Sequence, residues 1–225
     1  MIANLAAALL LAASVAPIEA LPDQGEPLSD VAYKEDLLAA GARNGRLPGD
    51  SLVLIESSPG CFIEKEAAEA WLLMADHAAA DGVEFTPSWC YRNLATQKRT
   101  YQRNCPLVPV ETPSAPDEPR EGEVETAAAP VAMVRVCSPP TARPGNSNHG
   151  WGRAVDITSG ERLLTCNSEA FGWLEENAHL YGWVHPGWAG CGEPKQEAWH
   201  WEWGGTQEPP PPPSPVAYSR RITPY

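Results

Sequence analysis

The chain is poor in basic residues, and this scarcity excludes one large class of partner. Its 225 residues include 16 Lys and Arg against 29 Asp and Glu, so the formal net charge is −13 at pH 7. Nucleic-acid binding depends largely on cationic side chains that neutralise phosphates. We therefore predict no nucleic-acid partner. The total charge says little about other ligands, because the charge near a site matters more than the sum.

The sequence also lacks a long apolar run of the kind that spans a membrane, which needs about 20 residues. Residues 1–20 are almost wholly apolar but contain no Lys or Arg. Within them, Leu5 to Ala16 suits the central region of a signal peptide, and Ile18 to Ala20 suits a cleavage site. We therefore predict a signal peptide and a secreted or cell-wall-associated, extracytoplasmic protein. Because the usual basic residue is missing, an uncleaved N-terminal anchor stays open, and a membrane contact is expected only in that case.

No two cysteines are spaced as Cys-x-x-Cys, which argues against a zinc site built from thiolates. An even number of cysteines behind a signal-like segment predicts three disulfides. The six residues are Cys61, Cys90, Cys105, Cys137, Cys166 and Cys191. The pairing stays open, and buried thiols are the alternative. A Cys105–Cys137 disulfide would tie together the ends of the segment between them.

Hydrophobic periodicity is absent from residues 107–132, which are rich in Pro, Ala and acidic residues. This composition predicts a solvated loop or a disordered insertion. The run from Pro209 to Pro213 must be extended polyproline, and residues 206–225 are interpreted as a proline-rich C-terminal tail. The remaining residues predict one folded domain over 51–205, preceded by an N-terminal extension over 21–50.

Helix and strand signals within the domain indicate an α+β fold. The clearest is an amphipathic helix over residues 64–80, which Gly82 ends. Further helices are predicted over 30–40, from the capping residue Asn93 onward, and from Ser168 to Tyr181. Short strands are predicted over 51–55, 83–85 and from 183. Helices segregated against a small antiparallel sheet form an α+β domain.

The stretch from Pro144 to Asp156 carries the first chemical signal. It places an imidazole, His149, seven residues before a carboxylate, Asp156, with Gly150 and Gly152 between them. The residues after Gly152 indicate the start of a buried strand. A carboxylate within such an apolar run is costly unless it is paired or binds a metal. This spacing is common in proteins and decides nothing by itself.

A second stretch, from Glu197 to Trp203, gives the first its meaning. Tryptophans alternate there with polar residues, as on a strand with one buried face. His149, Asp156 and His200 would form a His2Asp zinc site with an open fourth position, which is typical of catalytic zinc. Glu197 stands three residues before His200, where it can act as a base on a water molecule.

The local geometry of this second stretch cannot be that of a regular strand throughout. A strand would place Glu197 and His200 on opposite faces, so the segment must bend or make a helical turn before Trp199. Glu202 has two open interpretations, as a residue that orients a metal ligand or as a strand cap. His185 is interpreted as a loop residue near the cleft.

Together the two stretches resemble the LAS group of zinc peptidases, which includes VanY-like D-alanyl-D-alanine carboxypeptidases. The pattern of that group is Ser-x-His-x-x-Gly-x-Ala-x-Asp followed by Glu-x-x-His-Trp. Every position is matched, by Ser147, His149, Gly152, Ala154, Asp156, Glu197, His200 and Trp201. The resemblance covers roughly residues 60–205. It implies a small antiparallel sheet with helices packed on it and a zinc site in a cleft on the sheet.

The resemblance also implies residues that bind the substrate. The run from Tyr91 to Gln97 is similar to the family element Tyr-Arg-Ser-x-x-x-Gln, which meets the carboxylate end of the substrate. Arg92 suits this role because a guanidinium pairs with a carboxylate through two hydrogen bonds. Asn93 replaces the usual Ser, and Cys90 replaces a common Gly. These departures suggest a difference in fine specificity and a disulfide at Cys90.

The function that the resemblance implies is that of a secreted zinc metallo-carboxypeptidase, which hydrolyses the terminal D-Ala-D-Ala bond of peptidoglycan stem peptides. Glu197 would be the base, Arg92 and Gln97 would bind the substrate, and Ser147 would donate a hydrogen bond near the peptide or serve as a turn residue. A cell-wall endopeptidase or D,D-dipeptidase with the same zinc site is the enzymatic alternative. A non-catalytic wall-binding module stapled by zinc is the alternative of another class, and Glu197 argues against it. No partner protein is implied.

Overall fold

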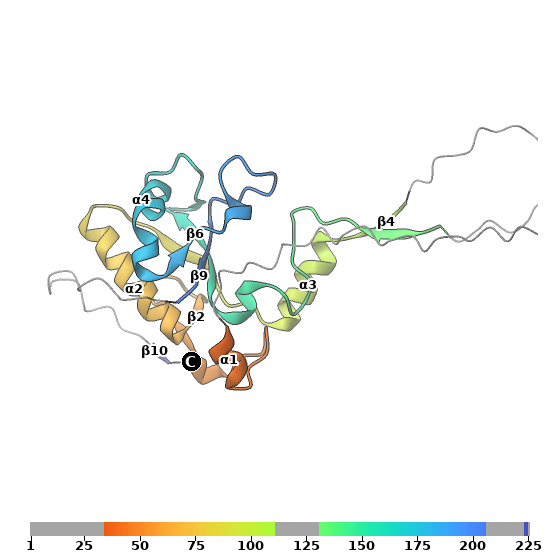
Figure 1. Ribbon diagram of the computed structural model, residues 1–225, viewed down its shortest axis with the longest axis horizontal. Helices are drawn as coiled ribbons and strands as arrows, with labels where there is room; N and C mark the ends of the chain where they lie inside the picture. Colours follow the sequence, from red (N-terminus) through yellow and green to blue (C-terminus); the bar gives the residue numbers. More distant parts are fainter. Residues whose placement is uncertain (1–33, 111–130, 206–222, 225) are drawn as a thin grey trace, which may run out of the picture.

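The computed structural model describes residues 34–110, 131–205 and 223–224 (Figure 1). The predicted signal segment and most of the proline-rich tail therefore lie outside the described residues. Among the described residues, no helix has the length and apolar character that a membrane span requires.

The described residues form a mixed structure of helices and short antiparallel strands, which confirms the α+β prediction. The α-helices are α1 (Glu35–Ala39), α2 (Lys65–Ala80), α3 (Leu94–Asn104) and α4 (Glu169–Asn177). The strands are β1 (Leu52–Leu54), β2 (Phe62–Glu64), β3 (Thr86–Trp89), β4 (Leu107–Pro109), β5 (Met133–Arg135), β6 (Ala154–Ser159), β7 (Arg162–Leu163), β8 (Trp183–Val184), β9 (His200–Trp203) and β10 (Thr223–Pro224).

The sheet that positions the candidate site has the strand order β3-β6-β9-β8, with β7 also paired to β6, and all its pairings are antiparallel. The register pairs Asp156 of β6 with His200 of β9 and with Trp89 of β3. Directly opposed residues have Cβ atoms only about 4.5–5.5 Å apart. The register therefore brings two residues 44 positions apart in the chain to one point on the sheet.

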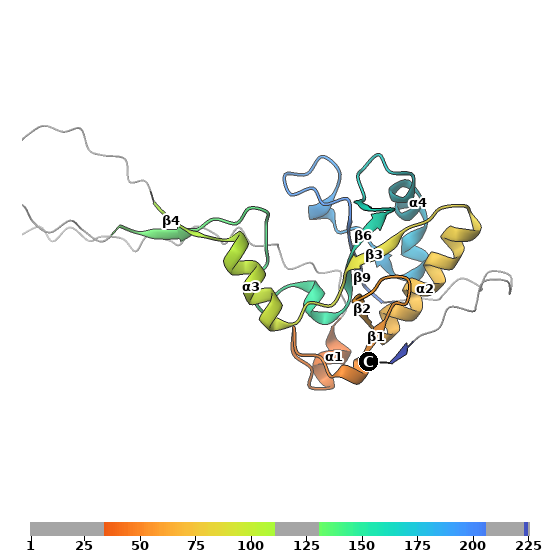
Figure 2. The same cartoon turned by 180° about the vertical axis from the view of Figure 1, so that it is seen from behind.

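The main core lies between this sheet and α2 and α4, which sit on one side of β6 and β9, whereas α3 lies on the other side (Figures 1 and 2). The ring of Trp71 on α2 packs edge-on against Trp183 of β8 at 5.4 Å and against Phe85 at 5.6 Å. Such aromatic pairs contribute about 0.5–1.5 kcal/mol each beyond the area they bury. The amphipathic helix thus anchors the sheet, as its sequence pattern predicts.

The end of α2 explains why one strand begins later than predicted. Gly82 adopts φ +82°, and the amide of Val83 donates to the carbonyl of Ala78 at 2.8 Å, which is a glycine-type helix end. Val83 is therefore occupied in closing the helix. The prediction of a strand over residues 83–85 is wrong, and β3 starts at Thr86, where pairing with β6 becomes possible.

The strand β9 also differs from its sequence pattern. Alternation of tryptophan with polar residues predicts one exposed face, yet all four residues of β9 are buried. The strand lies between β6 and β8; His200 belongs to the candidate site, and Glu202 contacts His200 instead of solvent. The alternation along β9 therefore separates an apolar face from a polar face, and both faces are buried.

The ends of the predicted insertion form a two-stranded ribbon. β4 lies within the predicted insertion and pairs with β5, which directly follows it, with Leu107 opposite Arg135 and Pro109 opposite Met133, so a loop is the wrong description of residues 107–109. The Cys105–Cys137 disulfide closes the base of the ribbon and holds the strands at pairing distance. Residues 111–130, which make up most of the insertion, lie outside the described residues.

All six cysteines form disulfides, as predicted: Cys61–Cys90, Cys105–Cys137 and Cys166–Cys191. The suggestion that Cys90 lies in a disulfide is thereby confirmed. Near the C-terminus, Thr223 and Pro224 pair with the edge of β1, so this part of the predicted tail joins a sheet.

Residues 34–50, predicted as part of an extension, pack against the loop that carries His149. The amide of Gly45 donates to the carbonyl of Gly150 at 2.7 Å, and its carbonyl accepts from the amide of Leu94 at 2.9 Å. The side-chain amide of Asn44 donates to the carbonyl of Ser147 at 2.7 Å. A Cβ at Gly150 would overlap the side chain of Asn44, so a larger residue would have to displace Asn44 from this position.

Candidate active site

Three side chains with metal-ligating atoms converge from three different elements. His149 lies in the short 3-10 helix η2 (Asn148–Trp151), Asp156 in the middle of β6, and His200 at the start of β9. Gly152, at φ +67°, ends η2 and turns the chain into β6. The ligating atoms of the three residues all lie within 4.8 Å of one another. The structure therefore brings together the predicted His2Asp set.

Outer hydrogen bonds fix which nitrogen of each histidine faces the site. Nδ1 of His149 lies 3.0 Å from the carbonyl of Cys90, and Nε2 of His200 lies 2.9 Å from Oε1 of Glu202. A carbonyl and a carboxylate accept, so each of these nitrogens carries the proton. The lone pairs of His149 Nε2 and His200 Nδ1 then point toward Asp156, at 3.5 and 3.1 Å.

This donor set fits zinc. Two imidazole nitrogens and one carboxylate oxygen, with tautomers fixed by outer acceptors, match the ligands that catalytic zinc takes in proteins. Burial would by itself raise the pKa of Asp156, but the neighbouring His149 and His200 lower that pKa well below its usual range. The carboxylate is thus held in the ionised form that a cation requires.

The ligands open into a cleft of about 440 Å³, whose wall includes His149, Asp156, His200, Glu197 and Arg92. The cleft therefore contains the three predicted metal ligands, the predicted base and the predicted carboxylate-binding arginine. It lies between the sheet on one side and α3 with the loop before His149 on the other.

The backbone of Glu197 makes three polar contacts that hold this residue in place. Its amide donates to the carbonyl of Ala189 at 3.0 Å, and its carbonyl accepts from the amide of His200 at 2.9 Å. The second bond closes a tight turn, which confirms that the chain bends before Trp199. The same carbonyl lies 3.1 Å from Nε2 of His185. The turn brings Glu197 to the cleft that His200 also lines.

His185 has a more specific role than a loop residue bordering the cleft. Its ring stacks on Trp201 at 5.0 Å between centroids, and its Nδ1 lies 3.4 Å from a carboxylate oxygen of Glu175. Burial lowers the pKa of His185. Its position behind the turn supports the backbone of Glu197.

Arg92 and Gln97 form a pair, but only Arg92 lines the cleft. Nη1 of Arg92 donates to Oε1 of Gln97 at 3.0 Å, and Nε2 of Gln97 donates to the carbonyl of Ala142 at 2.5 Å. Gln97 is buried and so holds the guanidinium from behind. Asn93 caps α3 by accepting from the amide of Thr96 at 2.8 Å, which fixes the start of the helix next to Arg92.

Ser147 is fully buried and does not line the cleft. Its Oγ has no hydrogen-bond partner among the residues that the structure describes, whereas its carbonyl accepts from Asn44. This arrangement favours the turn interpretation that the sequence leaves open. A hydrogen bond from Ser147 to a peptide would require the loop to rearrange.

Comparison with known proteins assigns the family. Residues 61–206 match the family model described as VanY, D-alanyl-D-alanine carboxypeptidase. The chain belongs to the VanY family. The putative carboxypeptidase YodJ of Bacillus subtilis (strain 168) is 30% identical over 129 residues, which is 55% of this chain. The match spans only 38% of the length of YodJ.

Two solved structures resemble this VanY-family chain more distantly. The vancomycin-resistance D,D-pentapeptidase VanY from a VanB-type resistance cassette, in complex with Zn(II), is 22% identical, with a TM-score of 0.43; the alignment covers 71% of this chain and 83% of that one. The LD-carboxypeptidase LdcB is 23% identical, with a TM-score of 0.46, and the corresponding coverages are 73% and 76%.

The structure contains a buried ion-pair cluster next to the VanY motif that was not predicted from the sequence. Arg153 is fully buried and donates to both carboxylate oxygens of Asp36, at 2.8 and 2.7 Å, and to Glu64 at 3.1 Å. Its guanidinium also lies 4.9 Å from the ring centre of Trp203. A charged residue inside an apolar run is the signal that could have revealed it, since such a charge needs partners.

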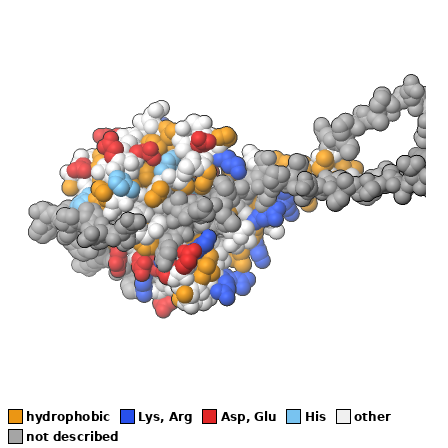
Figure 3. Space-filling view, in the orientation of Figure 1, with side chains coloured by type: hydrophobic (Ala, Val, Ile, Leu, Met, Phe, Trp, Pro, Cys, Tyr) orange, Lys and Arg blue, Asp and Glu red, His pale blue; other side chains and the backbone are white. Residues whose placement is uncertain are grey.

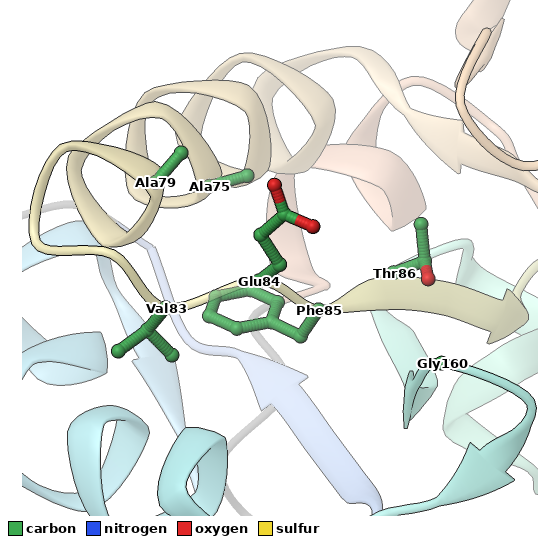
Figure 4. Close-up of a pocket in the computed structure, with 7 residues that line it drawn as sticks. All are labelled: Ala75, Ala79, Val83, Glu84, Phe85, Thr86 and Gly160. Carbon is green, nitrogen blue, oxygen red and sulfur yellow. The ribbon is translucent and has the colours of Figure 1, made fainter.

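A second hollow, of about 240 Å³, lies between α2 and the segment that leads into β3 (Figure 4). Its wall is formed mainly by small or apolar residues, and Glu84 is its one ionisable lining residue. It shares no residue with the His2Asp cleft of this VanY-family chain, and one carboxylate offers neither a metal site nor an acid–base pair.

Proposed function

We propose that this protein is an exported zinc D-alanyl-D-alanine carboxypeptidase that hydrolyses the terminal D-Ala-D-Ala bond of peptidoglycan stem peptides. The observation that carries the proposal is the convergence of His149, Asp156, His200, Glu197 and Arg92 on one cleft. Membership of the VanY family supports the substrate class.

His149 through Nε2, Asp156 through its carboxylate and His200 through Nδ1 would hold the zinc ion. When bound, zinc would polarise the scissile carbonyl and lower the pKa of a water molecule. Glu197 would accept a proton from the attacking water and pass it to the leaving amine of the terminal residue. The turn that places Glu197 beside His200 gives this base its position.

Arg92 would fix the end of the peptide that is cut. Its Nη1 donates to Gln97, and Arg92 lines the same cleft as the metal ligands. A guanidinium pairs with a terminal carboxylate through charge-assisted hydrogen bonds. This interaction would place the last peptide bond over the metal site and favour removal of a single terminal residue.

Export is proposed on three grounds. Three disulfides suit an oxidising compartment outside the cytoplasm, and the apolar residues 1–20 suit a signal peptide. Peptidoglycan, the proposed substrate, is also found outside the cytoplasm. Fractionation of cells that produce the full chain, followed by N-terminal sequencing, would test cleavage after residue 20.

The activity is tested by incubating the zinc-loaded protein with muropeptides and weighing the products. Wild type should release single D-alanine residues from peptides ending in D-Ala-D-Ala. Glu197→Gln should keep its fold and metal but lose about 10²- to 10⁴-fold in rate, the usual contribution of an acid–base group. Glu193→Gln is the matched control, because Glu193 is exposed in the same loop and is absent from the cleft wall.

Three outcomes would separate the candidate functions. Release of single D-alanine residues supports the proposal. Cleavage only inside cross-linked peptides, or release of the dipeptide, would replace it with the endopeptidase or dipeptidase. Binding of muropeptides without any cleavage by the zinc-loaded protein would favour a wall-binding module, and near-normal cleavage by Glu197→Gln would remove Glu197 as the base.

A further inference from the structure

The cleft that contains the metal ligands is also lined by one face of α3. Thr96, Thr100 and Arg103 line it, and these positions are four and then three residues apart. Residues with this spacing lie on the same face of an α-helix. The loop from Pro139 to Ala142 forms the facing wall. Arg103 therefore lies in the cleft that contains His149, but at the far end of the helix.

The segments that form this end of the cleft contain several basic residues and no acidic ones. Residues 88–110 and 131–147 contain six Lys and Arg and not one Asp or Glu, in a chain whose net charge is −13. The six are Arg92, Lys98, Arg99, Arg103, Arg135 and Arg143. Lys and Arg side chains gather toward the α3 end of the described surface, and most Asp and Glu lie elsewhere on it (Figure 3). An anionic group is favoured there over a cationic one.

Among these cations, Arg103 is the one at the far end of the cleft that can accept a ligand. Its Nε donates to Oδ1 of Asn104 at 3.0 Å, and its terminal nitrogens have no hydrogen-bond or ion-pair partner in the described part of the chain. Arg99 is bonded to Thr96 at 2.9 Å, and Arg135 donates to the carbonyl of Cys105 at 2.7 Å. Neither of these two lines the cleft.

The spacing between the two cleft arginines sets the size of the ligand. Arg103 stands nine residues beyond Leu94, the first residue of α3, and a rise of about 1.5 Å per residue gives ~14 Å along the helix. Arg92 precedes this start by two residues. An extended peptide advances about 3.3–3.6 Å per residue. A peptide whose terminal carboxylate lies on Arg92 would therefore bring its third or fourth preceding residue to Arg103.

We propose that Arg103 is a second carboxylate subsite, which selects peptides with an acidic residue three or four positions before the free C-terminus. This inference rests on the proposed function, because it assumes that the terminal carboxylate occupies Arg92. Thr96 and Thr100 offer hydroxyl groups to the peptide between the two arginines. The cleft would then select stem peptides by their length and charge as well as by their terminal carboxylate.

The test uses two labelled peptides that end in D-Ala-D-Ala and differ only by Glu or Gln at the third or fourth preceding position. Binding is measured by fluorescence anisotropy with the zinc-loaded Glu197→Gln protein, and D-alanine release is measured with the protein that retains Glu197. We expect the Glu peptide to bind about three- to ten-fold more tightly, a modest factor because Arg103 is exposed to solvent. The same preference should appear in KM more than in kcat.

Arg103→Gln should abolish the preference without weakening binding of the Gln peptide. Lys98→Gln is the matched control: it removes one charge from the same helix, but Lys98 lines a different hollow, with Arg46 and Asn93. A preference that survives in Arg103→Gln would overturn the subsite. An equal loss in Lys98→Gln would also overturn it, because a diffuse field for any polyanion would then explain the data.

The two readouts separate this inference from the proposed function. Release of D-alanine from both peptides at equal rates, with equal binding, overturns the Arg103 subsite and leaves the carboxypeptidase proposal standing. Release from neither peptide, with an Arg103-dependent binding preference intact, overturns the carboxypeptidase proposal and supports the subsite.

Discussion

Nε2 of His200 lies 2.9 Å from Oε1 of Glu202, and both side chains are buried. The two residues are separated by one position on β9, so their side chains share a face of the strand. The pairing turns Nδ1 of His200 toward Asp156. Of the two interpretations of Glu202 that the sequence leaves open, the structure supports the one in which this carboxylate orients a metal ligand.

Glu202→Gln should therefore weaken metal binding while preserving the fold. The amide keeps the size of the carboxylate but lowers the basicity of the imidazole and no longer fixes its tautomer. Loss of such an outer partner typically costs about 10- to 100-fold in metal affinity or activity. Competition against a chelator of known affinity measures the change. Glu176→Gln, an exposed change on α4, is the control, and unchanged zinc affinity in Glu202→Gln would contradict the role.

The metal set itself is tested by removing one imidazole at a time. Zinc-loaded wild type should contain one zinc per chain, and His149→Ala and His200→Ala should each lose most of it, because two remaining ligands bind zinc weakly. Elemental analysis after dialysis against a weak chelator gives the content. His179→Ala removes an exposed histidine outside the cleft and should keep full occupancy. Full occupancy in His200→Ala would remove that residue from the site.

The metal ligands could be predicted from sequence because short-range spacing and two separate motifs define them. His149 and Asp156 are joined by a tight glycine turn, and Glu197 and His200 by a single bend. The distances within each pair are therefore fixed locally. The expectation that the two pairs form one site rested on the family resemblance, and the strand register that joins them, with Asp156 opposite His200, was not predicted.

Contacts between distant segments could not be predicted in this way. Arg153 pairs with Asp36 across 117 positions, and the burial of Gln97 behind Arg92 depends on the carbonyl of Ala142. Composition describes residues 107–109 as loop, whereas pairing with β5 at the Cys105–Cys137 disulfide makes them a strand. In each case a partner far along the chain decides the structure.

The Asp36–Arg153 ion pair predicts how stability depends on pH. The hydrogen bond from Arg153 lowers the pKa of Asp36. A lowered pKa in the folded state means that the pair stabilises the fold above the unfolded pKa of about 4, and that this contribution is lost as the pH falls through the lowered value. Burial raises the pKa of Glu64, so Glu64 changes the stability with pH in the opposite direction to Asp36. This contribution is present in every variant that retains Glu64.

Asp36→Asn should therefore be less stable than wild type at pH 7, by about 1–2 kcal/mol, since Asp36 is partly exposed and Arg153 keeps Glu64 as a partner. The difference should shrink as the pH is lowered below about 4. Urea unfolding at pH 7 and at successively lower pH values gives the difference in unfolding free energy and its change with pH. Asp50→Asn, an exposed change in the same segment, is the control. A difference that stays constant with pH would exclude the ion pair as its cause.

The last prediction concerns the end of the peptide that Arg92 recognises. If Arg92 binds a C-terminal carboxylate, amidation of that terminus should lower kcat/KM by about 30-fold or more, because breaking a charge-assisted pair costs roughly 2–5 kcal/mol. Arg92→Ala should cause a similar loss on the free acid and little further loss on the amide, since both changes remove the same interaction.

Lys98→Ala, which removes a charge outside the cleft, should affect acid and amide equally. Gln97→Ala should show a weaker form of the Arg92→Ala pattern, because Gln97 holds the guanidinium in place. Additive losses from amidation and Arg92→Ala would mean that Arg92 and the terminal carboxylate do not meet, and the proposed single-residue cleavage would then lose its structural basis.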